Sequence, residues 1–176
     1  LEIKKRDRFW SFCMKAYNQA LVDFMEKKGK WMQEELSIPS TWYFNEGDRD
    51  DIMNWDEKDA KRVWEQIKNN VKKHKCSGLR YEFCPFCHKY DYKHQGCSKV
   101  LHNQSCLICT YGKRHGMCTD LNEGASQYRQ ILRAFEDDRI DIYRFFSESY
   151  YHELIDELDN MIERSYLHPM NEFQYK

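Results

Sequence analysis

Hydrophobic residues in the first part of the chain recur at helical spacing, as they do along the buried face of an amphipathic helix. We expect a helix over residues 5–36, which Gly29 could kink or divide in two. Pro39 ends this helix, because proline cannot continue one and biases the preceding residue toward extended backbone. The acidic run at residues 45–51 is expected to be a loop. The apolar positions of the helix are Phe9, Trp10, Cys13, Tyr17, Leu21, Phe24, Met25, Trp31 and Met32.

A second amphipathic stretch is predicted to begin near Asp56 and to end near residue 73. Asp is a favourable residue at a helix N-terminus, since its carboxylate accepts a hydrogen bond from a free backbone N–H. Acidic residues in the first turn and lysines in the last turn also suit the helix dipole. The positions expected to be buried are Ala60, Val63, Trp64, Ile67 and Val71.

The periodic pattern is lost over residues 76–118 and returns after them. Residues 79–83 could form a short strand, as in zinc ribbons, and the rest of the segment is expected to be loop. Beyond it, helices are predicted over residues 127–135 and, at nearly heptad spacing, from Ile142 to about Tyr166.

The predicted fold class is mainly α, a body of four or five helices with an inserted zinc-ribbon or knuckle-like module. The body would combine N-terminal helices in residues 1–75 with C-terminal helices in residues 119–176, and the module would occupy residues 76–118.

Four cysteines carry the strongest chemical signal in the chain. Cys84 and Cys87 form one C-x2-C pair, Cys106 and Cys109 form another, and eighteen residues separate the pairs. This is the ligand spacing of a four-thiolate zinc site. Residues 76–118 also contain few aliphatic side chains, so a bound metal is needed to offset the entropy lost when that segment becomes ordered.

The number and kind of metal stay open at this point. Additional ligands could come from Cys76, Cys97, Cys118, His102 and His115. Two zinc ions would use Cys76, Cys84, Cys87 and Cys97 for one site, and His102 or His115 with Cys106, Cys109 and Cys118 for the other. An iron–sulfur cluster is the alternative, held by Cys106, Cys109, Cys118 and one upstream cysteine.

The charge distribution points to a macromolecular partner. Residues 68–118 carry ten Lys and Arg against two Asp and Glu, although the whole chain has a net charge of −1. Cationic side chains contact phosphates and aromatic rings stack on unpaired bases, so we expect a nucleic-acid surface. Its candidate residues are Lys89, Lys93, Lys99, Lys113, Arg114, Tyr90 and Tyr92. The alternative is a protein–protein adaptor, in which the basic segment complements the acidic C-terminal helix of the same chain or a protein partner.

No catalytic residues are predicted. The chain lacks the His-Glu-x-x-His pattern of zinc proteases, and it also lacks the phosphate-binding glycine loops and the zinc-deaminase signature. Cys84-Pro85-Phe86-Cys87 matches a glutaredoxin-type dithiol, but no βαβ pattern surrounds it. We expect no leader peptide and no membrane span, and reduced thiols in a cytoplasmic protein. Oligomeric state is left open, with a homodimer as one option.

The cysteine pairs, together with Gly112, Gly116, Cys118 and Tyr128 downstream, resemble a pattern in short cysteine-rich proteins of phages and prokaryotic genomes. The resemblance covers roughly residues 84–130. This chain lacks the Cys-Pro after the second pair and the Thr-Pro-Tyr near the end that such proteins usually show. That group has no assigned activity, so the resemblance implies a zinc-binding module and no catalytic role.

Overall fold

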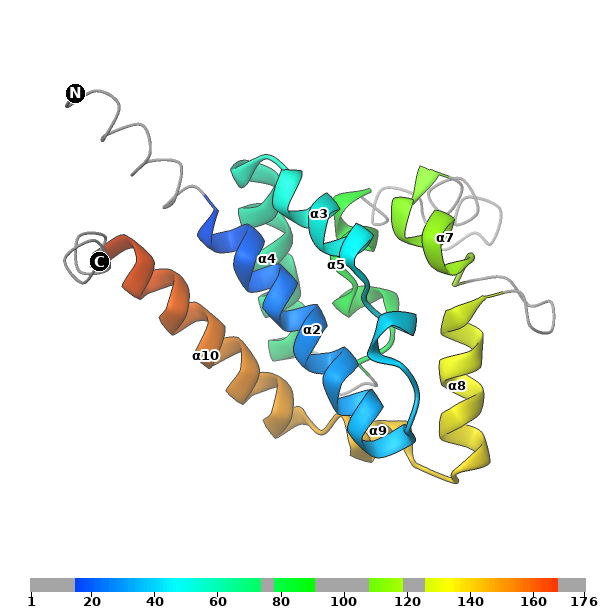
Figure 1. The fold of residues 1–176 in the computed structure, drawn as a ribbon. Coiled ribbons are helices and arrows are strands. Elements are labelled where there is room, and N and C mark those ends of the chain that lie inside the picture. The colour runs from blue at the N-terminus through cyan, green and yellow to red at the C-terminus, as the bar shows by residue number, and fades with distance from the viewer. Residues whose placement is uncertain (1–14, 74–77, 91–107, 119–125, 168–176) are drawn as a thin grey trace, which may run out of the picture.

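The computed structural model describes residues 15–73, 78–90, 108–118 and 126–167. These residues are mainly helical and contain no strand, which confirms the predicted fold class at that level (Figure 1). The zinc-ribbon form of the inserted module is not seen among them. The helices are α2 (Ala16–Leu36), α3 (Glu46–Asn54), α4 (Glu57–Lys73), α5 (Pro85–Lys89), α7 (Thr110–His115), α8 (Gln127–Asp137), α9 (Ile142–Phe145) and α10 (Glu148–Leu167), with 3-10 turns η1 (Ser40–Trp42) and η2 (Tyr81–Phe83).

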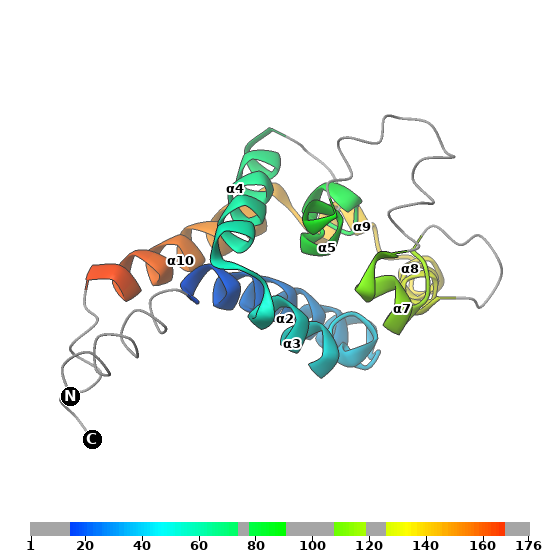
Figure 2. The same cartoon turned by 90° about the horizontal axis from the view of Figure 1, so that it is seen from above.

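Helix α2 lies at the centre of the described chain. It packs against α10, α4, α3 and the turn η1, and these elements cover it from several sides (Figures 1 and 2). Helix α5 packs on α4, α7 contacts α3, and α8 contacts η1. The cysteine-bearing helices therefore rest on the N-terminal helices.

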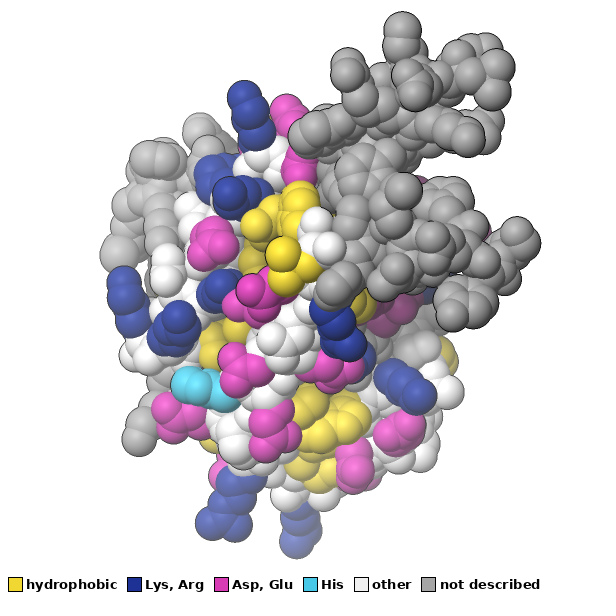
Figure 3. Space-filling view, turned by 90° about the vertical axis from the view of Figure 1, so that its left-hand side faces the viewer, with side chains coloured by type: hydrophobic (Ala, Val, Ile, Leu, Met, Phe, Trp, Pro, Cys, Tyr) yellow, Lys and Arg dark blue, Asp and Glu magenta, His cyan; other side chains and the backbone are white. Residues whose placement is uncertain are grey.

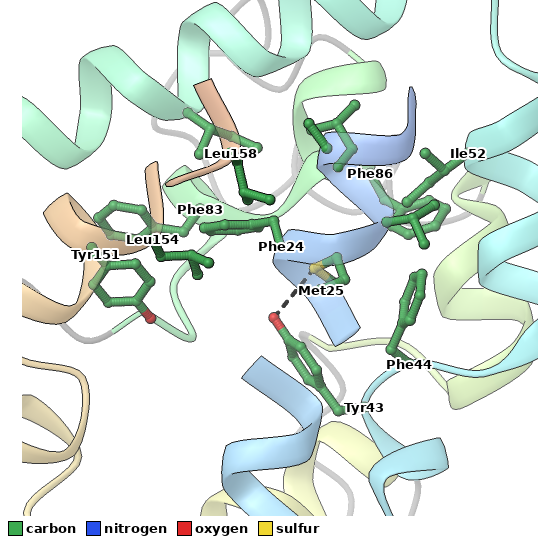
Figure 4. Close-up of a cluster of buried hydrophobic side chains, with 14 of the residues drawn as sticks. Phe24, Met25, Tyr43, Phe44, Ile52, Phe83, Phe86, Tyr151, Leu154 and Leu158 are labelled. Atoms are coloured by element: carbon green, nitrogen blue, oxygen red, sulfur yellow. Dashed lines mark hydrogen bonds between the residues drawn. The ribbon is translucent and has the colours of Figure 1, made fainter. Parts of the chain in front are cut away.

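Aromatic side chains fill much of the core between these helices (Figure 4). Phe24 of α2 meets the ring of Trp64 edge-on at a centroid distance of 6.4 Å, and Phe83 stacks on Tyr151 of α10 at 5.3 Å. The indole N–H of Trp64 donates a hydrogen bond of 2.7 Å to the Asp159 carboxylate. The core thus joins α2, α4, η2 and α10, which are far apart in sequence.

The prediction for α4 is confirmed in both its start and its buried face. The Asp56 carboxylate accepts a hydrogen bond of 3.2 Å from the backbone N–H of Lys58, so it satisfies one of the free donors of the first turn. All five residues of the predicted stripe are buried: Ala60, Val63, Trp64, Ile67 and Val71.

The acidic segment at residues 45–51 was predicted to be a loop, and this is wrong, because most of it forms α3. Asn45 and Asp48 make a capping box in which each side chain accepts a hydrogen bond from the other residue's backbone N–H. Such reciprocal caps start a helix even where charged residues lower its intrinsic propensity. Asp48 is also fully buried, which its acidic neighbours in the sequence do not indicate.

The short strand predicted at residues 79–83 is also wrong. Tyr81–Phe83 is the 3-10 turn η2, and α5 follows directly at Pro85. A strand needs a neighbour to satisfy its backbone groups, and the described residues supply none. Proline suits the first helical position because its missing N–H would be unpaired there in any case.

Two predicted helix features also differ from the structure. Helix α2 passes through Gly29 without interruption, and a Cβ at that position would lie 3.3 Å from the Ser40 carbonyl oxygen. Glycine there allows η1 to approach closely. The heptad run from Ile142 is divided into α9 and α10 at Phe146, whose backbone leaves helical geometry and whose ring is buried.

Gly78, which precedes η2, lies against Tyr151 of α10, and a substitution of Gly78 tests how much this contact stabilises the fold. A Cβ at Gly78 would overlap the Tyr151 hydroxyl group and ring. We predict that Gly78→Ala lowers the free energy of unfolding by about 2 kcal/mol, as overpacking of a filled core does. Urea denaturation followed by tryptophan fluorescence measures this. Gly29→Ala, where the nearest atom is 3.3 Å away, is the control and should cost clearly less. Equal effects would contradict the close packing of Gly78 on Tyr151.

Candidate metal centre

The first cysteine pair is positioned by the start of a short helix. Cys84 is the N-cap of α5, Pro85 is its first residue, and Cys87 lies in the first turn. Phe86 is fully buried; its ring packs edge-on against Trp55 at a centroid distance of 5.2 Å and, tilted, against Tyr111 of α7 at 5.1 Å. Burial of this one aromatic side chain fixes both sulfurs relative to the helical body.

The second set of cysteines flanks α7. Cys109 is the N-cap of α7, and Cys118 follows the turn at Gly116, whose φ of 82° lies in a region that other residues rarely adopt. The Tyr111 hydroxyl donates a hydrogen bond to the Tyr43 carbonyl oxygen. This bond and the Tyr111–Phe86 contact place α7, with Cys109 at its start, beside α5.

The two thiols of the first pair have pKa values shifted in opposite directions. The Cys87 thiol donates a hydrogen bond to the Cys84 sulfur, and this lowers the pKa of Cys84 to about 7 against the opposing effect of burial. Backbone N–H groups of Cys87 and Phe86 and the cation of Lys28 lower it further. The same hydrogen bond raises the pKa of Cys87, as do burial and the negative charges of Cys84, Cys118 and Cys109.

Three other thiols therefore lie within electrostatic range of Cys87: those of Cys84, Cys109 and Cys118. All four are partly buried. As placed, no group of three or more His, Cys, Asp and Glu side chains in the described ranges meets the geometry of a metal site. Thiolates are ligands that proteins use for zinc, so this set is tested below as a zinc site.

The structure describes three of the four cysteines that the sequence predicts as primary metal ligands. Cys84, Cys87 and Cys109 are brought to one region, and Cys118, predicted only as an additional ligand, joins them. Cys106, Cys76, Cys97 and His102 lie outside the described residues.

His115, the other additional candidate, takes part in a buried polar network instead. Its two ring nitrogens lie 2.6 Å from the Asp48 carboxylate and 2.5 Å from the Gln127 side-chain oxygen. Arg114 donates hydrogen bonds of 2.7 Å to both Asp48 and Asp51. The network ties α7 to α3 and engages both nitrogens of His115, so we leave that residue out of the ligand set.

The residues predicted to bind nucleic acid are partly engaged within the chain. Lys89 pairs with Asp59 of α4 at 2.6 Å, Arg114 pairs with α3, and the Tyr90 hydroxyl lies 3.1 Å from that of Thr110. Lys113 is exposed, and Lys93, Lys99 and Tyr92 lie outside the described residues. The acidic partners are on α3 and α4. Lys68, at the start of the basic segment, instead pairs with Asp159 of the C-terminal helix α10 at 2.6 Å. The hypothesis that this helix complements the segment therefore describes Lys68 and does not describe Lys89 or Arg114.

Charges of both signs are interspersed on the face shown in Figure 3, with hydrophobic side chains in small groups between them. That face therefore offers no surface of a single charge. Within the described residues, no helix combines the length and the apolar character needed to cross a bilayer.

Sequence reasoning missed Lys28, whose charge reaches Cys84. Its side chain is 1% exposed. A signal was present, because Lys28 follows Phe24 and precedes Met32 by four positions each, and so lies on the apolar face of α2.

No protein-family model, curated protein or solved structure matches this chain. The resemblance to cysteine-rich proteins of phages and prokaryotes therefore stays a prediction.

The buried network gives a prediction about how α7 is held. Asp48→Asn places an amide where the carboxylate accepts hydrogen bonds from Arg114, His115 and Asn45. We expect the free energy of unfolding to fall by about 3 kcal/mol, since removing one partner of a buried ionic network strands the others. Urea denaturation measures it. Asp50→Asn changes an exposed carboxylate of the same helix and should cost little. A loss no larger than in this control would exclude a stabilising role for the network.

Proposed function

We propose that this chain is a non-catalytic binding protein whose central segment is organised by a structural Zn²⁺ ion. The ligands are Cys84, Cys87 and Cys109, with a fourth thiolate from Cys118 or Cys106. The observation that supports this most is that the charges of three other cysteines, Cys84, Cys109 and Cys118, all act on the Cys87 thiol. The proposal requires reducing conditions, such as those of a cytoplasm, because the thiolates must not be oxidised.

The shortness of the cysteine-bearing helices supports a structural role for the metal. Helix α5 has five residues and α7 has six, far below the length at which an isolated helix is stable in water. A thiolate-bound zinc ion supplies about 10 kcal/mol or more in small peptides, which is sufficient to order such a segment. Zinc would then join α5 and α7 directly, in addition to the contact between Phe86 and Tyr111.

The metal proposal predicts one zinc ion per chain after purification under reducing conditions. Elemental analysis and native mass spectrometry measure it. Cys87→Ser should abolish tight binding, and only one of Cys106→Ser and Cys118→Ser should do the same, which identifies the fourth ligand. Cys97→Ser is the control: retention of all metal supports one site, and loss of one of two ions supports the two-zinc arrangement.

A brown protein containing iron would replace zinc by an iron–sulfur cluster. Recovery of a metal-free chain with all eight cysteines reduced would overturn the proposal.

The partner that we propose is a nucleic acid, bound by the cations of the central segment that are not used within the chain. Residues 68–118 keep an excess of eight positive charges. Because Lys89 and Arg114 pair with carboxylates, they are assigned a role in folding, and contacts are assigned to Lys93, Lys99, Lys113 and Tyr92. The same pairing favours the second candidate, a protein–protein adaptor, since it removes two of the predicted phosphate contacts.

Salt dependence separates these two candidates. Affinity for a labelled single-stranded oligonucleotide, measured by fluorescence anisotropy, should fall steeply with salt concentration. Lys93→Glu with Lys99→Glu should weaken binding about tenfold and make the slope of log K against log salt shallower by about 1.4, the value for two lost phosphate contacts. Lys30→Glu with Lys58→Glu, at exposed positions of α2 and α4, is the control and should change little. No binding even at low salt would leave the adaptor function.

A further inference from the structure

The imidazole ring of His115, the last residue of α7, lies between two oxygen atoms. Its Nε2 is 2.6 Å from Oδ2 of Asp48 on α3, and its Nδ1 is 2.5 Å from the side-chain oxygen of Gln127, the first residue of α8. A carboxylate oxygen and an amide oxygen accept hydrogen bonds and donate none. Each ring nitrogen therefore donates, and a ring with a proton on both nitrogens is the imidazolium form of histidine.

The charges around the ring favour the same form. Asp48 is fully buried and accepts hydrogen bonds from the Arg114 guanidinium, the His115 ring and the backbone N–H of Asn45. Arg114 also pairs with Asp51 at 2.7 Å. The two carboxylates carry two negative charges and Arg114 supplies one positive charge, so an imidazolium completes the balance. An unbalanced charge is unfavourable in a site from which water is excluded.

Water has little access to this ring. His115 is 2% exposed, and its ring stacks on that of Tyr111 at a centroid distance of 4.2 Å. A neutral imidazole has one N–H, so it donates either to Asp48 or to Gln127 and turns a lone pair toward the other oxygen. One proton therefore decides whether His115 holds both neighbouring helices or only one of them.

We propose that His115 is a pH-dependent contact that holds α7 against α3 and α8. With α7 in place the ring keeps a proton that it loses when α7 is released into water. Because the closed form binds one proton more than the open form, α7 is held less firmly as the pH rises. The change begins above about pH 6.5, where histidine in an unfolded chain loses its proton. Neither a metal ion nor a nucleic acid enters this contact, so its test is independent of the proposed function.

Other charged and titratable groups lie near the ring, and a variant at position 115 separates their effects from that of His115. From α8 the contact is Gln127, which does not titrate, and the nearest charge along that helix is that of Arg129. Burial raises the pKa of Tyr111 well above its ordinary value, so its hydroxyl stays protonated. The remaining groups lie on α3, on α7 and just beyond it: Asp48, Asp51, Arg114 and Cys118. All of them are unchanged in such a variant.

Nitrogen-15 NMR of the full chain measures the protonation of each histidine ring and needs no substitution. We expect both ring nitrogens of His115 to carry protons at about pH 7.5, where an ordinary exposed histidine has lost one. His152 on α10 is exposed and serves as the internal reference. A neutral His115 ring, found while the backbone amides of α7 remain protected from hydrogen exchange, would overturn the inference.

Hydrogen exchange measured by mass spectrometry shows how firmly α7 is held. Protection of its amides, corrected for the intrinsic effect of pH on exchange, should fall by up to about tenfold per pH unit above about pH 6.5, the value for one proton. His115→Gln cannot carry the charge, so its protection should be lower at pH 6.5 and change little with pH. His152→Gln is the control and should follow the wild type. Equal pH profiles in the wild type and His115→Gln would contradict the proposal.

Gln127→Glu tests the direction of the effect. A carboxylate beside the ring favours the imidazolium, so the loss of protection should begin about one pH unit or more above that of the wild type. A profile that is unshifted, or shifted to lower pH, would show that the Nδ1 atom of His115 does not donate to residue 127 and would also overturn the inference.

Discussion

Burial of α2 on several sides is the constraint on which the rest of this structure depends. Eleven residues spread around that helix are buried, among them Leu21, Phe24, Met25 and Met32. A helix with apolar groups on more than one side must be covered by several partners. Helices α3, α4 and α10 provide that cover, and the platform that they form supports the short cysteine-bearing helices.

The cysteine segment is attached to this platform by two kinds of contact. Apolar contacts place Phe86 between Trp55 and Tyr111. Polar contacts join α7 to α3 through the buried Asp48, which accepts hydrogen bonds from Arg114 and His115. Both act over long sequence separations, so the positions of α5 and α7 depend on the packing of the N-terminal helices. A metal ion would then stabilise an arrangement that the platform already favours.

The engagement of basic residues changes the interpretation of the charge pattern. Lys89 and Arg114 belong to a segment that is strongly basic in sequence, yet each pairs with a carboxylate of the N-terminal helices. Hydrogen bonding to Lys89 lowers the pKa of Asp59, as expected for a carboxylate held beside a cation. Part of the basic character therefore serves folding, and only the remainder is available for a nucleic acid or a protein partner.

Local patterns in the sequence determined the helical class and the extent of α4 with its buried stripe, whereas the expected loop after residue 83 contains the helices α5 and α7. The correctly predicted features depend on residues within a few positions of one another, where periodicity and capping chemistry are decisive. Only the tertiary structure decided that residues 46–54 form a helix with a buried Asp48, that Lys28 is buried in the core, and that the C-terminal run breaks at Phe146. Asp48 and Arg114 are 66 residues apart, and a contact at that distance is selected by the packing of whole helices, which no local pattern records.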